Sequence, residues 1–155
     1  MQDEQVNAIA NGIEKISLGP GETKQTIREN VWNYLEKNDI AKFPRPVNKR
    51  IPNYEGAIQA CDNLPGLDAF KTAQTIKVNP DKPQEQARFL VLEGGKTLVV
   101  TPLRRSARKN VLHRMEPPKD ASDKDLRLCS RYQGVKEFSV PVGFESKVHV
   151  DLVVV

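Results

Sequence analysis

The sequence predicts an α/β protein with an open, mixed or mostly parallel sheet and flanking helices. The first observation is that apolar runs of strand length alternate with amphipathic helical segments from residue 23 onward. The second is that these runs are separated by turns rich in glycine and proline. The chain of 155 residues, 38% of them hydrophobic, is long enough to bury a core.

The domain is predicted to begin after a polar tail. Residues 1–22 carry Gly19-Pro20-Gly21 and predict a flexible N-terminal segment ahead of a domain at 23–155. Ile27, Val31 and Leu35 then recur at helical spacing, and Thr23 is a candidate N-cap. This pattern predicts a helix that ends near residue 38.

The rest of the chain predicts short elements joined by turns. Continuous apolar runs rather than alternating ones favour a sheet covered on both faces. The first expected elements are short helices at 57–64 and 67–73 and strands at 75–78, 87–92 and 97–101. Ser122, as N-cap, then opens a helix that runs to about Tyr132, with Gly134 at its C′ position. Strands at 135–140 and 148–155 follow.

Composition favours a protein with a mild preference for polyanions and argues against a secreted or membrane-spanning protein. The net charge of +4 and pI of about 9.1 give a mild preference for polyanions. The N-terminus lacks the pattern of a signal peptide, and no apolar run reaches the ~20 residues that cross a bilayer. We therefore expect no membrane association and a cytoplasmic or nucleocytoplasmic location. Cys61 and Cys129 are expected to be free thiols, and no residues have metal-ligand spacing.

The most informative stretch is the proline-rich arm, residues 43–56. Three prolines fix their own φ angles and push the preceding residues toward extended conformations. The pattern predicts a stiff, non-helical arm from which Arg45, Lys49 and Arg50 project. A proline-rich spacer with incidental cations explains the same residues equally well.

A series of motifs gives a resemblance to a known family. They are FPRPVNKRIPNYEGA at 43–57, VNPDKP at 78–83, GKTL at 95–98, VVTP at 99–102, YQGV at 132–135, SVPVG at 139–143 and VDLVVV at 150–155. Taken together over residues 23–155, they resemble the methenyltetrahydrofolate synthase domain-containing branch of the 5-formyltetrahydrofolate cyclo-ligase family. The resemblance implies a cyclo-ligase-like fold of the NagB/RpiA/CoA transferase-like type.

The resemblance also implies a ligand site. Lys24 and Arg28 match the Lys-x-x-x-Arg pattern of the family, whose two cations contact nucleotide phosphate and whose arginine also reaches folate. Spacing of i, i+4 places both on one helix face. A solvated helix face is the alternative. Asn53 stands where catalytic members carry an acidic residue that contacts folate, with Glu55 two residues later. An amide cannot supply a carboxylate's charge, which counts against cyclo-ligase chemistry.

A basic cluster suggests contact with nucleic acid. The cluster comprises Arg104, Arg105, Arg108, Lys109 and Arg114. Together with Arg45, Lys49 and Arg50 it forms a candidate phosphate-contacting surface. A solvated loop is the alternative. Longer animal relatives within the family carry an RNA-recognition domain, which makes RNA a candidate partner.

The resemblance also implies an ATP-binding loop after the last predicted strand. In the family, a glycine-rich loop ending in Tyr-x-Asp follows the last strand and grips the ATP phosphates, and no such loop is found here. We expect either a sheet incomplete at the C-terminus, with exposed apolar surface and self-association, or a sheet completed in another way.

Three functional hypotheses follow. The chain is a non-catalytic cyclo-ligase-like binding module, linked to RNA through longer forms. Alternatively, it is an active 5-formyltetrahydrofolate cyclo-ligase that uses ATP and Mg²⁺ to form 5,10-methenyltetrahydrofolate. The third hypothesis is a fragment without a function of its own. We favour the binding module, with folate and ATP as conditional ligands.

Overall fold

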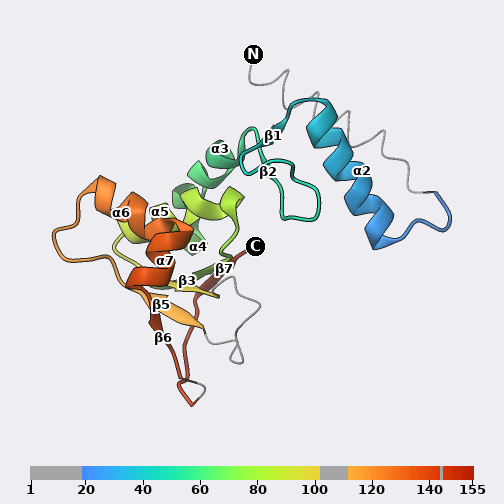
Figure 1. The fold of residues 1–155 in the computed structure, drawn as a ribbon. Coiled ribbons are helices and arrows are strands. Elements are labelled where there is room, and N and C mark those ends of the chain that lie inside the picture. The colour runs from blue at the N-terminus through green and yellow to red at the C-terminus, as the bar shows by residue number, and fades with distance from the viewer. Residues whose placement is uncertain (1–18, 102–111, 144) are drawn as a thin grey trace. The chain divides into compact units, whose positions relative to one another are not determined.

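The computed structural model describes residues 19–101, 112–143 and 145–155 (Figure 1). The chain forms two compact units, one ending at Glu55 and the other beginning at Gly56. Each unit is described by itself. The predicted N-terminal tail lies almost wholly outside the described residues, so the boundary after residue 22 stays a prediction.

The first unit contains the predicted helix, α2 (Lys24–Lys37). Thr23 is its N-cap as expected, because the Thr23 hydroxyl accepts a hydrogen bond from the Thr26 amide and the Thr26 hydroxyl accepts one from the Thr23 amide. The proline-rich arm is closed by two short antiparallel strands, β1 (Ala41–Lys42) and β2 (Asn53–Tyr54). The arm is therefore a loop tied at its base.

The second unit is built on one mixed sheet. Its elements are α3 (Ala57–Asp62), α4 (Asp68–Thr72), β3 (Thr75–Val78), α5 (Glu85–Glu93), β4 (Thr97–Val100), β5 (His113–Met115), α6 (Asp123–Ser130), α7 (Tyr132–Phe138), β6 (Val140–Pro141) and β7 (Leu152–Val154), with 3₁₀ turns at Leu64–Gly66 and Lys82–Gln84. The strand order is β6-β5-β4-β3-β7. β3 is parallel to β4 and β7, and β5 is antiparallel to β4 and β6. The predicted α/β class is confirmed.

The core of this unit lies between the sheet and α5, α6 and α7, which Figure 1 shows together over one face of the sheet. Ile76 and Leu98 are fully buried and pack with Phe89 of α5 in one hydrophobic cluster. Buried and partly buried positions alternate along β3, whereas no residue of β7 is fully buried and Val153 is half exposed. Of the strand expected at 148–155, only Leu152–Val154 forms a strand, β7, and it lies at the edge of the sheet rather than in its centre.

Two predicted strands are helices. Residues 87–92 belong to α5, and most of 135–140 belongs to α7. Five of the six residues at 87–92 are buried, so this part of α5 has no polar face that would reveal the helical period. Gly134 does not end a helix but lies inside α7, and the preceding helix ends at Ser130.

Arg88 is the largest fully buried side chain, with 1% exposure. Its Nε donates to the Ser130 carbonyl at 2.8 Å, and its Nη1 donates to the carbonyls of Asn79 at 2.7 Å and Asp81 at 2.9 Å. Burial lowers the pKa of Arg88 to about 10. The guanidinium therefore joins the end of α6 to the turn after β3 through α5.

Gly134 allows α7 to pack closely against the end of α6. A Cβ atom at this position would lie 1.9 Å from the Leu128 carbonyl oxygen and 2.7 Å from the Cys129 Cα. Both are backbone atoms, so a side chain can be accommodated only if one helix moves.

We expect Gly134→Ala to lower the free energy of unfolding by about 1–3 kcal/mol through this overlap. Gly66→Ala is the matched control, because no atom lies within 4 Å of a Cβ there, and its effect should stay within about 0.5 kcal/mol. Urea unfolding followed by circular dichroism measures both. Equal stability of the two variants would show that α6 and α7 separate without cost.

Candidate ligand-binding groove

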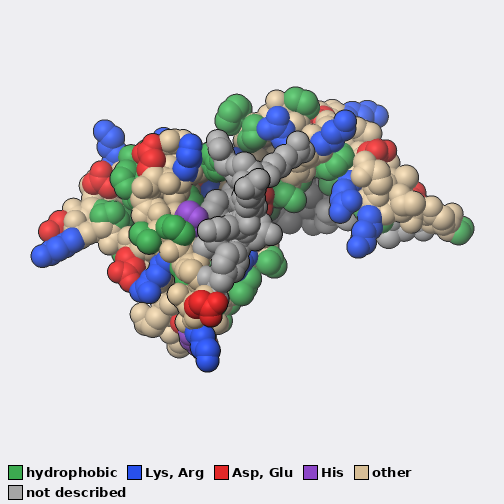
Figure 2. Space-filling view, turned by 60° about the horizontal axis from the view of Figure 1, so that its bottom comes forward, with side chains coloured by type: hydrophobic (Ala, Val, Ile, Leu, Met, Phe, Trp, Pro, Cys, Tyr) green, Lys and Arg blue, Asp and Glu red, His purple; other side chains and the backbone are tan. Residues whose placement is uncertain are grey.

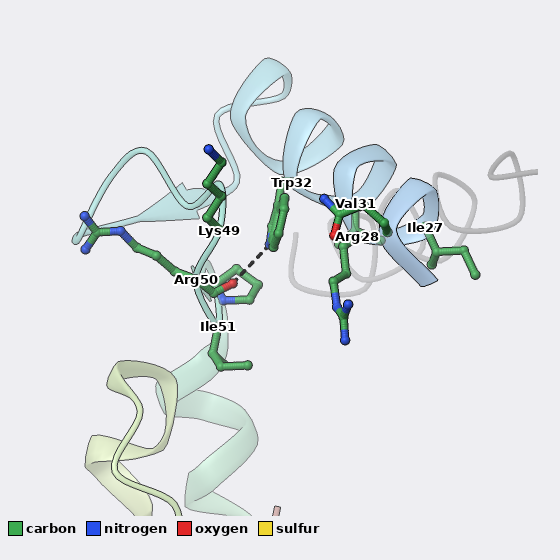
Figure 3. A pocket seen from close by; sticks show the side chains of 9 residues that line it. Ile27, Arg28, Val31, Trp32, Lys49, Arg50 and Ile51 are labelled. Carbon is green, nitrogen blue, oxygen red and sulfur yellow. Dashed lines mark hydrogen bonds between the residues drawn. The ribbon is translucent and has the colours of Figure 1, made fainter. Parts of the chain in front are cut away.

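An open groove of about 740 Å³ lies in the first unit between α2 and the second half of the arm (Figure 3). It is called here the Trp32 groove. Its apolar wall combines Val31 and Trp32 of the helix with Ile51 and Pro52 of the arm. Its polar wall includes Gln25, Arg28, Lys49 and Arg50. The groove therefore offers an apolar surface bordered by positive charge.

Trp32 fixes the arm against the helix. The indole is 8% exposed and packs in a small core with Ala41 and Val47. Its Nε1 donates a hydrogen bond to the Arg50 carbonyl oxygen at 3.1 Å, drawn as a dashed line in Figure 3. Because the donor of a buried indole is satisfied by the arm itself, the arm is held at the edge of the groove.

Three of the predicted cations border this groove. Arg28 comes from α2, and Lys49 and Arg50 come from the arm. Figure 3 shows that their side chains extend in different directions and do not converge on one point. Lys24, the partner predicted for Arg28, is not among the residues that line the groove. The Lys-x-x-x-Arg pair is thus not brought together in the groove.

Arg45 stabilises the arm by hydrogen bonds to two carboxylates. Its Nη2 and Nε donate to one Glu36 oxygen at 2.7 Å and 3.0 Å, and its Nη1 donates to Asp39 at 2.7 Å. The other Glu36 oxygen accepts the Val47 amide at 2.7 Å. The hydrogen bond from Arg45 lowers the pKa of Glu36, and the Val47 amide lowers it further. The Arg45 hydrogen bond also lowers the pKa of Asp39.

The two folate candidates also hold the arm. The Asn53 side-chain amide donates to the Phe43 carbonyl at 2.8 Å, across the base of the loop. Glu55 forms an ion pair with Lys42, on the strand that pairs with Asn53 and Tyr54. Both groups therefore already have partners within the first unit, and neither lines the Trp32 groove.

The predicted nucleic-acid surface is only partly described. Arg104, Arg105, Arg108 and Lys109 lie outside the described residues. Arg114 lies on β5, where it pairs with Glu116. On the face of the molecule shown in Figure 2, basic side chains of the second unit are interspersed with acidic ones. Contact with nucleic acid stays a prediction.

Sequence reasoning missed the residue at the centre of the groove. Trp32 falls between the helical positions used to predict α2, although it is the only tryptophan in the chain. A single large aromatic residue one turn beyond Arg28 and near a proline-rich segment was the available signal. In the part of the chain that is described, no group of three or more His, Cys, Asp or Glu residues could hold a metal ion. The same residues contain no helix long and apolar enough to cross a membrane.

The Glu36 carboxylate gives the arm a predictable pH dependence. Because its pKa is lowered in the folded chain, its stabilising effect is present above the ordinary carboxyl range and is lost as the pH falls through the folded pKa. We expect the Val47 amide signal in NMR spectra to titrate with a midpoint below about 4.3, the ordinary glutamate value. Arg45→Gln should raise that midpoint.

Glu29→Gln is the control, because the Glu29 carboxylate bonds to the exposed Gln25 side chain and not to the arm. It should leave the Val47 titration unchanged. A Val47 signal indifferent to Arg45→Gln would mean that the Glu36–Arg45 contact does not hold the arm.

The chain is similar in sequence to several curated animal proteins that share one name. It is 56% identical over 135 residues to a methenyltetrahydrofolate synthase domain-containing protein of Mus musculus, which covers 87% of this chain and 36% of the relative. The protein of that name from Danio rerio is 49% identical over 140 residues, covering 90% and 36% of the two chains. The Homo sapiens protein is 48% identical over 135 residues, covering 87% and 35%.

No family model and no solved structure matches. The chain spans about a third of the length of these curated relatives. Over the matched residues, which make up most of its length, this chain belongs with the methenyltetrahydrofolate synthase domain-containing proteins.

Proposed function

We propose that this chain is a methenyltetrahydrofolate synthase-like domain that binds a folate-type ligand in the Trp32 groove without turning it over. The observation that carries the proposal is the composition of the groove, which joins an apolar surface to a rim of cations. A flat heterocycle with an anionic tail matches both parts. The name of the relatives, which refers to a tetrahydrofolate derivative, favours folate among such ligands.

The apolar wall suits a ring system. Val31, Ile51 and Pro52 present aliphatic surface beside the indole edge of Trp32. A ring placed there removes apolar surface from water at about 25 cal/mol per Å². Arg28, Lys49 and Arg50 diverge, so they suit an extended chain of carboxylates better than one compact phosphate group. A glutamate tail has this chemistry.

The positions of the expected catalytic groups favour binding over turnover. Phosphoryl transfer depends on cations that converge on the transferred group. Here the three groove cations diverge, and Lys24 does not line the groove. Asn53 and Glu55 have partners that tie the base of the arm. A groove arranged in this way can hold a ligand, but it concentrates little charge at one atom.

The alternative is an active ATP-dependent cyclo-ligase, favoured by the word "synthase" in the relatives' name. In that reaction, ATP and Mg²⁺ activate the formyl oxygen of 5-formyltetrahydrofolate as a phosphate ester. The N10 amine then displaces this ester on ring closure. A further proposal is that longer forms of the protein act with RNA, in the cytoplasm or in both nucleus and cytoplasm. No feature of the Trp32 groove bears on this proposal.

We expect 5-formyltetrahydrofolate to change the fluorescence of Trp32 in a saturable manner, after correction for absorption by the ligand. The chain has one tryptophan, so the signal reports on this groove alone. Arg28→Gln and Arg50→Gln should each weaken binding, by roughly tenfold if a charged hydrogen bond is lost. Lys37→Gln, an exposed lysine in the last turn of α2, is the matched control and should have no effect.

The same samples, given ATP and Mg²⁺, should show no rise in methenyltetrahydrofolate absorbance above the protein-free control. A rise that disappears in Lys24→Ala would replace the binding module with the enzyme. Unchanged fluorescence at saturating ligand would remove the Trp32 groove as the folate site.

A further inference from the structure

A second hollow lies wholly within the second unit, at the amino ends of β3 and β4. It is an open groove of about 460 Å³, called here the amino-end groove. Thr75 and Thr97 are the first residues of the two parallel strands and form one wall. Arg114 of β5, the strand next to β4, and the segment that returns from β6 toward β7 line the rest of the groove (Figure 1).

Hydrogen-bond donors dominate the polar lining of this groove. Arg114, Lys147 and His149 supply nitrogen donors, and Thr75, Thr97 and Ser146 supply hydroxyls. None of the lining residues that the structure describes is acidic. The lining therefore carries the permanent positive charges of Arg114 and Lys147, and positive charge attracts an anion.

Several of these groups lack a partner in the protein. Among the residues that the structure describes, no hydrogen bond joins the hydroxyl of Thr75, Thr97 or Ser146 to another group, and Lys147 forms no ion pair. Two acids nearby engage members of the set: Glu116 pairs with Arg114, and Asp151 pairs with His149 at 2.9 Å. Exposed pairs of this kind exchange readily for a better acceptor, because each contributes little.

The backbone fixes the walls of the groove. The Asp151 carboxylate accepts the amides of Gln74 and Thr75 at 2.9 Å each, and the Asp151 amide donates to the Thr75 carbonyl at 2.9 Å. On the other wall, the Ser146 amide donates to the Gly143 carbonyl at 2.9 Å. The end of the segment that carries Lys147 and His149 is therefore tied to β3, which limits the ordering cost of binding.

We propose that the amino-end groove binds a phosphate group. A tetrahedral anion accepts hydrogen bonds from several directions at once, which suits hydroxyls, a guanidinium and an ammonium group around one hollow. The lining side chains that the structure describes include no phenylalanine, tyrosine or tryptophan, which favours the phosphate rather than a base as the recognised group. The phosphate comes either from a small phosphate compound or from the backbone of single-stranded RNA. This site is separate from the Trp32 groove and does not depend on the folate proposal.

The test is an NMR titration of the full 155-residue chain with inorganic phosphate, at fixed pH and constant ionic strength. We expect saturable amide shifts at Thr75, Thr97 and residues 146–149. The double variant Arg114→Gln/Lys147→Gln should weaken binding by at least about tenfold, because two charged donors are lost. Lys136→Gln, an exposed lysine on α7, is the matched control and should bind as the unaltered chain does.

Shifts that do not saturate, or equal affinity in the double variant and the unaltered chain, would overturn the proposal. So would equal weakening in the control variant. Parallel titrations with uridine monophosphate and a short oligouridylate identify the source. Tighter binding of the oligomer that weakens with salt assigns the site to RNA backbone, whereas equal binding of all three assigns it to small phosphates.

Discussion

The second unit depends on a buried cation that forms no ion pair with any carboxylate the structure describes. The Arg88 guanidinium is held by three backbone carbonyls, from Asn79, Asp81 and Ser130. Removing such a donor leaves buried acceptors unpaired, which costs more than the hydrogen bonds contribute. The covering helices are thereby fixed over the sheet. Because the end of α6 is held in place, position 134 of α7 has room only for a glycine, since a Cβ atom there would overlap the backbone of α6.

The first unit shows that charge in a sequence differs from charge available to a ligand. Arg45 and Lys49 lie four residues apart in one proline-rich segment, yet Arg45 is bonded to Glu36 and Asp39, while Lys49 borders the Trp32 groove. Proline stiffness alone does not determine where the arm lies. The Glu36 carboxylate does so by binding Arg45 and the Val47 amide together. Hydrogen bonds to the carboxylates of Glu36 and Asp39, rather than the prolines, therefore determine which cations of the arm are left for a ligand.

Local signals in the sequence predicted what local physics controls. Thr23 and Ser122 were identified as N-caps, and both form capping boxes in the structure, because a hydroxyl three residues before a suitable partner acts without help from the rest of the chain. The α/β class followed from the same kind of pattern.

The sequence did not reveal that α5 is a helix, because a buried apolar run of this length fits a strand equally well. The Trp32 groove could not be predicted, because it arises when residues on a helix meet residues some twenty positions later. The Arg45 contacts depend on tertiary structure in the same way.

Asp151 has a consequence for synthesis on the ribosome. β3 and β4 can pair and accept α5 as soon as residues 75–100 have left the exit tunnel, because their contacts are close in sequence. The amides of Gln74 and Thr75 must wait for the carboxylate of Asp151, 76 residues beyond Thr75. During that interval, the amino end of β3 is hydrated and the strand has one neighbour fewer. The nascent second unit therefore exposes one edge of β3, its first strand, until Asp151 has emerged.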